Sequence, residues 1–460
     1  MRLSRHQFIR ATLALASALV VLPLGLSAAN AATKIQRVVS PGGIEAWLVQ
    51  DATVPLVAME YAFGGGAAQD PADKPGVSNM MAELLDEGAG DLDSSAFHDR
   101  LERRAIQMTF QTSRDYLRGA LRMLKDDRDE AFDLLRLALT EPRFDTEPVE
   151  RIRAQMASAL RRESTTPSSL GNRAFWRLAF PDHPYGKPTN GTLESLPTIQ
   201  AGDLNDYRRR VLAKDTLKIA VVGDIDAAAL GKLLDLAFGK LPAKAQLTPV
   251  PDVAVAAPPQ RVFVPLDVPQ TAIMFGGPGL KRDDPDFMTA YVLNHILGGG
   301  ALSSRLYREV REKRGLAYSV YESLIWMNRS ALFAGATATR ADRASETADT
   351  VTSEIRRMAE EGPTQTELDE AKSYLKGSQM LALDTSSKIA GALVQYQIDN
   401  LGIDYIEKRN ALVDAVTLAD AKRVAKRLWG QGLLTVVVGR AKEASVQPVQ
   451  TPTPPPTGKN

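Results

Sequence analysis

Side chains that commonly bind catalytic metals are scarce in this sequence of 460 residues. Because it contains no cysteine, disulfides, thiol catalysis, thiolate metal sites and iron–sulfur clusters are excluded. The histidines are His6, His98, His183 and His295, and a metal site made only of histidines would be difficult to build from them. We expect structural roles for the last three.

One group of carboxylates has the chemistry to hold a cation. Glu83 and Glu87 are four residues apart, a spacing that places both on one face of a helix, and Asp86 lies between them. Oxygen ligands of this kind suit hard cations such as calcium. Three carboxylates at the end of a helix are more often solvated surface, so we favour a surface role over a metal site.

The helix that would carry these carboxylates is expected over residues 77–87. Its apolar positions follow the i, i+3, i+4, i+7, i+8 spacing of a helix packed on a sheet. They are Val77, Met80, Met81, Leu84 and Leu85. Gly88 and Gly90 are expected to end the helix.

Two strands are expected before this helix. Residues 43–50 and 56–63 alternate or run apolar, and we expect them to pair as a hairpin with Gly42-Gly43 as its turn.

The other elements alternate between helices and strands. Amphipathic helices are expected over 129–140, 147–162, 342–360 and 365–381. In the second half a helix is expected over 303–312, ended by Gly315, and a strand over 316–324. Runs of strands separated by several helices indicate an α+β protein in which helices cover mainly antiparallel sheets.

The sequence contains a long internal repeat. VPLVAMEYAFGGG in the first half corresponds to VPQTAIMFGGPG in the second, and the halves end in LKIAVVGDID and LLTVVVGRAK. We therefore expect two homologous domains, at 33–242 and 260–443, related by internal duplication. The proline-rich segment 243–259 is the expected linker, and the proline-rich tail 444–460 is expected to be disordered.

The N-terminus has the three parts of an export signal. Arg2, Arg5 and Arg10 form a basic start, residues 11–28 are almost uninterruptedly apolar, and residues 29–31 supply the small side chains that a signal peptidase needs. An uncleaved membrane anchor is the alternative. The start also resembles a twin-arginine signal with His6 in place of its second arginine. We expect cleavage of residues 1–31 and a periplasmic protein without a second membrane span.

Charge and composition exclude nucleic acid as an expected partner. The chain is 44% hydrophobic and 24% charged, as in a globular protein, and its net charge is +1. Loss of residues 1–31 removes three arginines and no acidic residue, which leaves 53 basic against 55 acidic side chains. A net charge of −2 gives no electrostatic attraction to a polyanion.

These features together resemble the pitrilysin family of zinc metallopeptidases, in the branch of mitochondrial processing peptidase and its bacterial relatives. The resemblance is carried by residues 71–90, 180–226 and 297–323, and the last segment is LGGGALSSRLYREVREKRGLAYSVYES. Because these segments are spread through both halves, the resemblance covers nearly all of 33–443. It implies two homologous α+β domains, which face two more around a chamber that admits unfolded peptides.

The resemblance places the family's inverted zinc motif, H-x-x-E-H, on residues 79–83. In that motif two histidines one helical turn apart bind zinc, and the glutamate acts as base on the zinc-bound water. Here Asn79 and Glu83 stand at the histidine positions and Ala82 at the position of the base. The third ligand of the family, a glutamate, would fall near Ala157. We therefore expect no metal in this chain.

The same resemblance gives the second half a different part of the site. In the family, an arginine and a tyrosine seven residues apart bind the scissile carbonyl and the developing oxyanion, and here they correspond to Arg311 and Tyr318. Guanidinium and phenol are fixed donors suited to that task, so we favour this role over a surface charge and a half-buried aromatic. Gly298, Gly299 and Gly300 are interpreted as backbone that passes close to a peptide substrate or a neighbouring helix.

The resemblance implies that this chain is the non-zinc subunit of an exported heterodimeric peptidase and is not active alone. A homologous partner carrying H-x-x-E-H would bind zinc, and Arg311 and Tyr318 would complete its site on unfolded peptide substrates. The alternative is a catalytically inactive structural or peptide-binding homologue that acts as a homodimeric scaffold. Hydrolysis by this chain alone is the weakest hypothesis, because no nucleophile–base pair stands out in the sequence.

Overall fold

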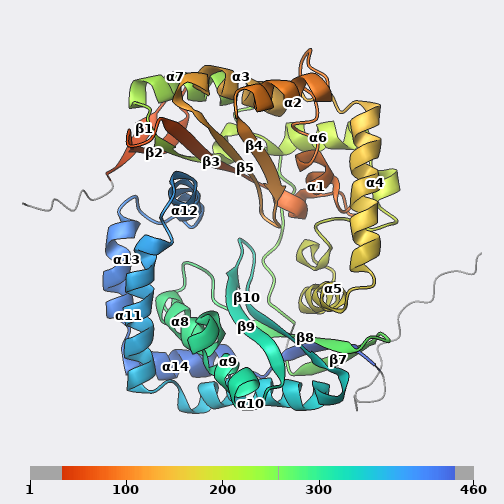
Figure 1. Ribbon diagram of the computed structural model, residues 1–460, viewed down its shortest axis with the longest axis vertical. Coiled ribbons are helices and arrows are strands. Elements are labelled where there is room, and N and C mark those ends of the chain that lie inside the picture. The colour runs from red at the N-terminus through yellow and green to blue at the C-terminus, as the bar shows by residue number, and fades with distance from the viewer. Residues whose placement is uncertain (1–33, 257, 441–460) are drawn as a thin grey trace, which may run out of the picture. The chain divides into compact units, whose positions relative to one another are not determined.

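The computed structural model describes residues 34–256 and 258–440. The expected signal at 1–31 and the expected tail at 444–460 lie outside these residues. From Ile35 onward the described chain forms one compact unit that contains two β-sheets covered by helices (Figure 1). None of its described helices is both long and apolar enough to cross a membrane.

The first sheet and its helices come from the first half of the chain. The strands are β1 (Ile35–Val39), β2 (Glu45–Gln50), β3 (Leu56–Gly64), β4 (Gln107–Thr112), β5 (Tyr116–Leu124) and β6 (Lys218–Gly223). The helices are α1 (Val77–Ala82), α2 (Ser94–Arg103), α3 (Arg128–Thr140), α4 (Thr146–Glu163), α5 (Pro167–Ala179), α6 (Ala201–Val211) and α7 (Ala227–Phe238).

The second sheet and its helices come from the second half. The strands are β7 (Gln260–Pro265), β8 (Gln270–Pro278), β9 (Ala317–Trp326), β10 (Ala331–Arg340) and β11 (Leu434–Gly439). The helices are α8 (Phe287–Asn294), α9 (Arg305–Tyr307), α10 (Ala344–Glu361), α11 (Gln365–Leu381), α12 (Ser386–Ile398), α13 (Tyr405–Asp414) and α14 (Leu418–Trp429).

The two sheets repeat one strand order. The first is β1-β2-β6-β3-β5-β4 and the second is β7-β11-β8-β10-β9, so β1 is the only strand of the first sheet that lacks a counterpart among the described residues of the second. The pairs β2–β6 and β7–β11 are parallel, and every other pair is antiparallel. This confirms the expected fold class of two homologous α+β halves with mainly antiparallel sheets.

The hairpin expected between residues 43–50 and 56–63 is wrong. The turn at Gly42 and Gly43 joins β1 to β2, and β6 lies between β2 and β3. Strand β6 is intermediate or buried at every position, and such a continuously apolar strand needs a neighbour on each side. Strand β6 therefore lies between β2 and β3 in the sheet, although β2 and β3 are neighbours in sequence.

Both faces of the first sheet are buried. Ala46 and Leu48 of β2 face the main core with α3 and α7, whereas Trp47 and Val49 face a second cluster. The second cluster is completed by Leu393 of α12, a helix of the second half that packs on β3 and β6. Figure 1 shows α12 on the opposite face of this sheet from α3 and α7.

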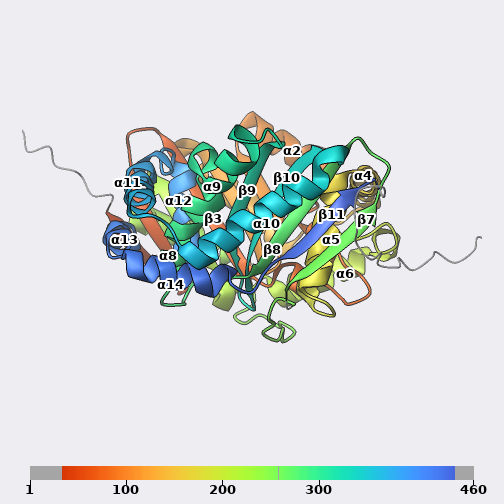
Figure 2. The ribbon, with the colours of Figure 1, turned by 90° about the horizontal axis from the view of Figure 1, so that it is seen from below.

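The second sheet is covered in the corresponding way. Helices α10 and α14 lie side by side over one face and contribute to its core with α8 and α11 (Figure 2). The other face carries α5, a helix of the first half, which packs on β8 and β11. The side chain of Phe175 on α5 would be 2.7 Å from a Cβ at Gly276, so this contact requires glycine in the sheet. Each half therefore contributes one helix to the sheet of the other: α5 covers the second sheet, and α12 covers the first.

The expected linker crosses between the halves without forming a regular element in its described residues. It is nevertheless held by backbone hydrogen bonds. The amide of Val253 donates to the carbonyl of Arg329 in the β9–β10 turn, and the amide of Ala256 donates to that of Ala179 at the end of α5. The linker is therefore hydrogen-bonded to both halves of the chain.

Candidate functional site

Helix α1, which carries the expected zinc positions, is held at its start by a buried carboxylate. Asp70 accepts hydrogen bonds from the backbone amides of Gly76 and Ser78 at 2.7 and 2.8 Å. Gly76 has a φ of 100°, and a Cβ there would lie 2.8 Å from the Cα of Gly191. Burial raises the pKa of Asp70 to about 6, against the opposing effect of these hydrogen bonds. The start of α1 is thus fixed against the loop around Gly191.

The residues at the expected zinc positions do not fit a zinc ion. Asn79 is half-buried, Ala82 is buried, Glu83 is exposed, and Ala157 packs against the core from α4. An amide, a methyl group and one exposed carboxylate do not supply the three nitrogen or oxygen ligands of a catalytic zinc site. In the part of the chain that the structure describes, no three His, Cys, Asp or Glu side chains form a group that could hold a metal ion.

The helix is also shorter than expected. It ends at Ala82, and residues 83–86 continue as turns, so Glu83 and Glu87 do not share a helix face. Burial works to raise the pKa of Glu87, but hydrogen bonds from Arg151 and Ser94, each 2.5 Å long, hold it below its usual value. Glu87 therefore ties the turns after α1 to α4 and α2. Glu87 is buried, so the surface role expected for it is wrong, and its contacts are structural.

The structure brings Arg311 and Tyr318 together in the second half. The Arg311 Nη1 donates to the backbone carbonyl oxygen of Tyr318 at 2.8 Å, and the guanidinium carbon lies 4.3 Å from the centre of the Tyr318 ring. Tyr318 is 80% exposed, and Arg311 is half-buried. The alternative that Tyr318 is a half-buried aromatic on a regular strand does not hold. The pair instead presents a guanidinium and a phenol to the surface.

A β-bulge explains the exposure of Tyr318. Along β9, Val320 pairs with Thr337 and Ala317 pairs with Thr339, so two residues of β9 oppose one residue of β10. Tyr318 and its neighbour are the bulged pair. In a regular strand Tyr318 would share the core-facing side with Val320, which is buried. The bulge turns the phenol outward.

A π-helical turn carries Arg311. Residues 308–312 follow α9 with hydrogen bonds that span one residue more than in an α-helix. Ion pairs anchor this segment: buried Arg305 donates from Nε and Nη2 to Glu367 of α11 at 2.7 and 2.6 Å, and Arg314 donates to Glu309 at 2.6 Å. Arg311 therefore projects from a fixed base. Such insertions occur frequently at functional sites.

A second aromatic ring at this site was missed by the sequence analysis. The Tyr307 ring centre lies 5.1 Å from the Arg311 guanidinium carbon, within the distance of a cation–π contact. The signal was present, because Tyr307 precedes Arg311 by four residues within the helix expected at 303–312. We infer that both rings restrict the guanidinium.

The three glycines have different surroundings. Gly298 is buried, and a Cβ there would lie 2.6 Å from the Cβ of Glu322 on β9, so this glycine allows the helix to approach the sheet. Gly299 is exposed and Gly300 is half-buried. Contact of these two with a peptide substrate stays a prediction.

Glu322 beneath Gly298 is a buried acid. It accepts a hydrogen bond from the side chain of Asn294 through one oxygen, and its Oε1 is buried without a hydrogen-bond partner among the described residues. Burial raises the pKa of Glu322 to about 8, against the opposing effect of Asn294. The side chain is therefore mostly protonated at neutral pH.

A raised pKa in the folded state means that Glu322 favours folding at low pH and opposes it as pH rises through about 8. We expect Glu322→Gln to gain stability relative to the parent protein between pH 5 and pH 9. Its advantage should grow by up to about 1.4 kcal/mol per pH unit while only the unfolded acid is ionised. Urea unfolding at several pH values measures this difference, with exposed Glu312→Gln as the control. Parallel stability curves for Glu322→Gln and the parent would contradict it.

Two of the histidines, His183 and His295, have structural contacts. His295 is buried and stacks on Tyr374 with ring centres 4.7 Å apart. His183 accepts at Nδ1 from the backbone amide of Tyr185, 3.1 Å away, and its Nε2 lies 3.1 Å from the carbonyl oxygen of Pro251. These contacts agree with the structural roles expected for both side chains.

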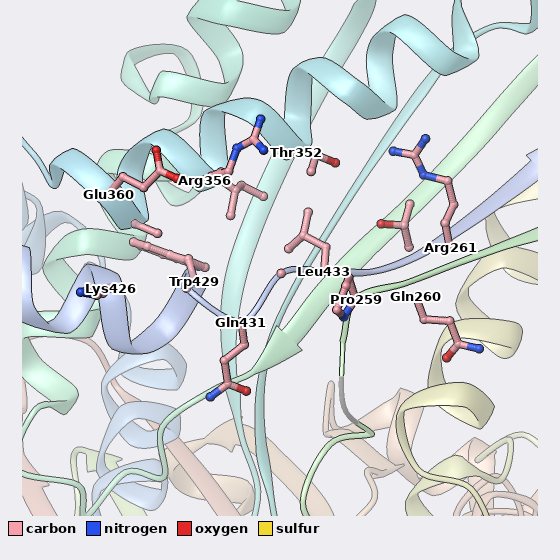
Figure 3. Close-up of a pocket in the computed structure, with 15 residues that line it drawn as sticks. Pro259, Gln260, Arg261, Thr352, Arg356, Glu360, Lys426, Trp429, Gln431 and Leu433 are labelled. Carbon is pink, nitrogen blue, oxygen red and sulfur yellow. The ribbon is translucent and has the colours of Figure 1, made fainter.

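A cavity of about 660 Å³ lies between α10, α14 and the starts of β7 and β11 (Figure 3). Arg261, Arg356 and Lys426 stand at its rim, and Trp429 and Leu433 line it. None of the side chains expected from the sequence to do chemistry lines this cavity. It is therefore separate from the Arg311–Tyr318 site.

Two family models match the chain. The model described as insulinase (peptidase family M16) matches residues 47–192, and the model described as peptidase M16 inactive domain matches residues 198–375. Together they include both the degenerate zinc positions and the Arg311–Tyr318 segment.

Individual relatives bear different names. A Helicobacter pylori protein named non-peptidase homolog YmxG is 28% identical over 345 residues, which cover 75% of this chain and 79% of that protein. A Streptomyces coelicolor protein named uncharacterized zinc protease is 26% identical over 422 residues, covering 89% and 90%. The crystal structure of a peptidase M16 inactive domain from Pseudomonas fluorescens has a TM-score of 0.83 at 26% identity, covering 91% of this chain and all of that one. Some relatives are named as proteases and one as a non-peptidase, so the names do not decide whether this chain is a peptidase. The residues at the site must decide it.

Proposed function

Because this chain belongs to peptidase family M16 and its zinc positions do not fit a zinc ion, we propose that it is the non-zinc subunit of an exported heterodimeric zinc metallopeptidase. In this proposal a homologous partner chain binds zinc through its own H-x-x-E-H motif. The present chain supplies Arg311 and Tyr318 to the partner's site. The substrates are unfolded peptides.

The observation that carries the proposal is the contrast between the two halves. The first half has Asn79, Ala82 and Glu83 where zinc chemistry needs two histidines and a base. The second half presents Arg311 and Tyr318 side by side, on a bulge and a π-helical turn that cost regular secondary structure. This arrangement supports a role for the pair in binding a substrate carbonyl.

The chemistry suits a site completed in trans. Arg311 uses Nη1 to bind the Tyr318 carbonyl, which leaves its other N–H groups and the Tyr318 hydroxyl for a substrate carbonyl oxygen. Donors aimed at an oxygen that gains charge in the transition state lower the barrier for peptide hydrolysis. The nucleophilic water and its base would come from the partner.

The N-terminal segment supports a periplasmic location for the proposed activity. The basic start, the apolar run and the small residues at 29–31 together support export and cleavage. The charge of the remaining chain supports neither nucleic acid nor an anionic membrane surface as a partner.

Purification of the complex from native periplasm tests the proposal. We expect a one-to-one complex with a chain of similar length that carries H-x-x-E-H, about one zinc ion per pair, and cleavage of a fluorogenic peptide. This chain alone should be inactive and free of stoichiometric zinc. A search of the adjacent reading frames for H-x-x-E-H would identify the partner for reconstitution.

The second candidate is a homodimeric scaffold that binds peptides or other proteins without catalysis. It is favoured by the name of the Helicobacter pylori relative, non-peptidase homolog, together with the lost zinc positions. The same purification distinguishes it, because a metal-free dimer of this chain without peptidase activity would replace the first proposal.

A further inference from the structure

A cavity of about 740 Å³ lies where the two halves meet. Its walls are the β4–β5 turn of the first half, the end of α5, the β9–β10 turn and the segment that ends α12. A volume of this size is typical of pockets that bind small ligands or short peptides. It contains neither the degenerate zinc positions nor the Arg311–Tyr318 pair.

Hydrogen bonds across the junction join the walls of this cavity. The Tyr116 hydroxyl donates to the Asn328 side chain at 2.9 Å, and the Asn328 amide donates to Asp115 at 2.9 Å. Arg118 of β5 donates to Gln395 of α12. The walls therefore belong to both halves but are fixed to each other.

Three arginines line the cavity, and aromatic rings hold two of them. The Arg114 guanidinium carbon lies 3.4 Å from the centre of the Trp176 ring, and its Nε donates to the carbonyl of Tyr185 at 3.0 Å. Arg282 lies 4.3 Å from the Phe287 ring centre. Stacked guanidinium groups lose little freedom on binding, and their planar fork matches the two oxygens of a carboxylate.

The carboxylates of the cavity are already engaged by neutral donors. Asp115 accepts from Tyr185 at 2.5 Å and from the amide of Asn328. Asp399 accepts from the Trp326 indole and from Gln395, each at 2.9 Å, and its nearest cation is Arg282 at 3.9 Å.

Two further charged residues complete the lining. Lys281 pairs with Asp252 at 2.9 Å, and Asp283 is the remaining acid. The three guanidinium groups therefore retain donors that no carboxylate of the cavity takes up at hydrogen-bond distance.

Burial lowers the pKa of Arg114 to about 10, so it stays charged at neutral pH. A charged guanidinium with a lowered pKa in a largely buried site gains stability when an anion binds beside it.

We propose that this cavity is a binding site for the carboxylate of a short peptide, held by Arg114, Arg118 and Arg282. Trp176 and Trp326 line the same cavity and contact the apolar part of the ligand. The proposal goes beyond the catalytic role of the chain, because it needs neither zinc nor a partner.

Titration of the whole chain with three synthetic peptides tests the site. Ac-Phe-Ala-Glu-Ala-amide offers only a side-chain carboxylate, Ac-Phe-Ala-Gln-Ala only a terminal carboxylate, and Ac-Phe-Ala-Gln-Ala-amide none. Two of the four tryptophans of the chain, Trp176 and Trp326, line the cavity, so intrinsic fluorescence reports binding. We expect at least one acidic peptide to bind ten or more times more tightly than the neutral one. The peptide that binds better identifies the source of the carboxylate.

Variants locate the binding. Arg118→Gln and Arg114→Gln should each weaken binding of the acidic peptide at least tenfold, and Arg118→Lys, which keeps the charge but loses the fork, should weaken it less. Arg103→Gln, an exposed arginine of α2, is the matched control and should change nothing. If Arg114→Gln fails to fold because the half-buried arginine is lost, the two Arg118 variants test the proposal. Equal affinity for the neutral peptide, binding unaffected by Arg118→Gln, or no binding of any peptide to the folded chain would overturn the proposal.

Discussion

Replacing Arg311 by alanine is expected to lower kcat/KM of the reconstituted peptidase pair by about 100- to 1000-fold, the loss seen when one oxyanion donor is removed. Tyr318→Phe, which removes only the hydroxyl, is expected to cost about 100-fold. Because the guanidinium lies 4.3 Å from the phenol ring, the two losses should not add fully in the double variant. Most of the loss should fall on kcat if both donors act mainly on the developing oxyanion.

The experiment combines each variant with the zinc-bearing partner and measures peptide cleavage, zinc content and complex formation. Arg340→Ala is a suitable control, because Arg340 is an exposed arginine at the end of the neighbouring strand β10 and pairs locally with Asp342. Zinc content and complex formation should be unchanged in all variants. Cleavage at the normal rate by Arg311→Ala would contradict the proposed role, even if the complex and its zinc are present.

The second large effect is expected at the junction of the halves. Asp115→Ala should destabilise the protein by about 3 kcal/mol, because it leaves the buried Tyr185 hydroxyl and the backbone amide of Asn328 without their acceptor. Burial, together with Asp115, holds the pKa of Tyr185 well above its usual value, so the phenol remains a donor at all ordinary pH values.

Urea unfolding of Asp115→Ala measures this loss. Tyr116→Phe is the matched control, because it removes a hydrogen bond to the side chain of the same Asn328 that lies at the exposed rim. We expect Tyr116→Phe to cost about 1 kcal/mol. Equal losses in the two variants would show that the buried carboxylate contributes nothing special to the junction.

Local elements were predictable where one periodicity runs for several turns. The helices expected at 129–140, 147–162 and 365–381 are found within one residue at each end, because their apolar stripes face a core. The helix expected at 77–87 is instead cut short at Ala82. There the apolar spacing continues into turns whose buried side chains, Leu84 and Leu85, reach the same core.

Long-range pairing was not predictable from local patterns. The expected hairpin was wrong because β6, distant in sequence, inserts between β2 and β3. The same limit applies to sites: the cavity arginines Arg114 and Arg282 come from different halves, and their spacing in sequence carries no signal. The Arg311–Tyr318 pair was found only through the family segment, since neither the bulge nor the π-helical turn has a sequence signature of its own.

The exchange of α5 and α12 bears on the history of the molecule. Each is the third helix after the matching strands β5 and β10, and each covers the sheet of the other half. When two copies of one small protein swap the same helix and are later joined end to end, a single chain with this reciprocal cover results. Such an origin would account for both the duplication in the sequence and the reciprocal cover, because each half depends on a helix of the other.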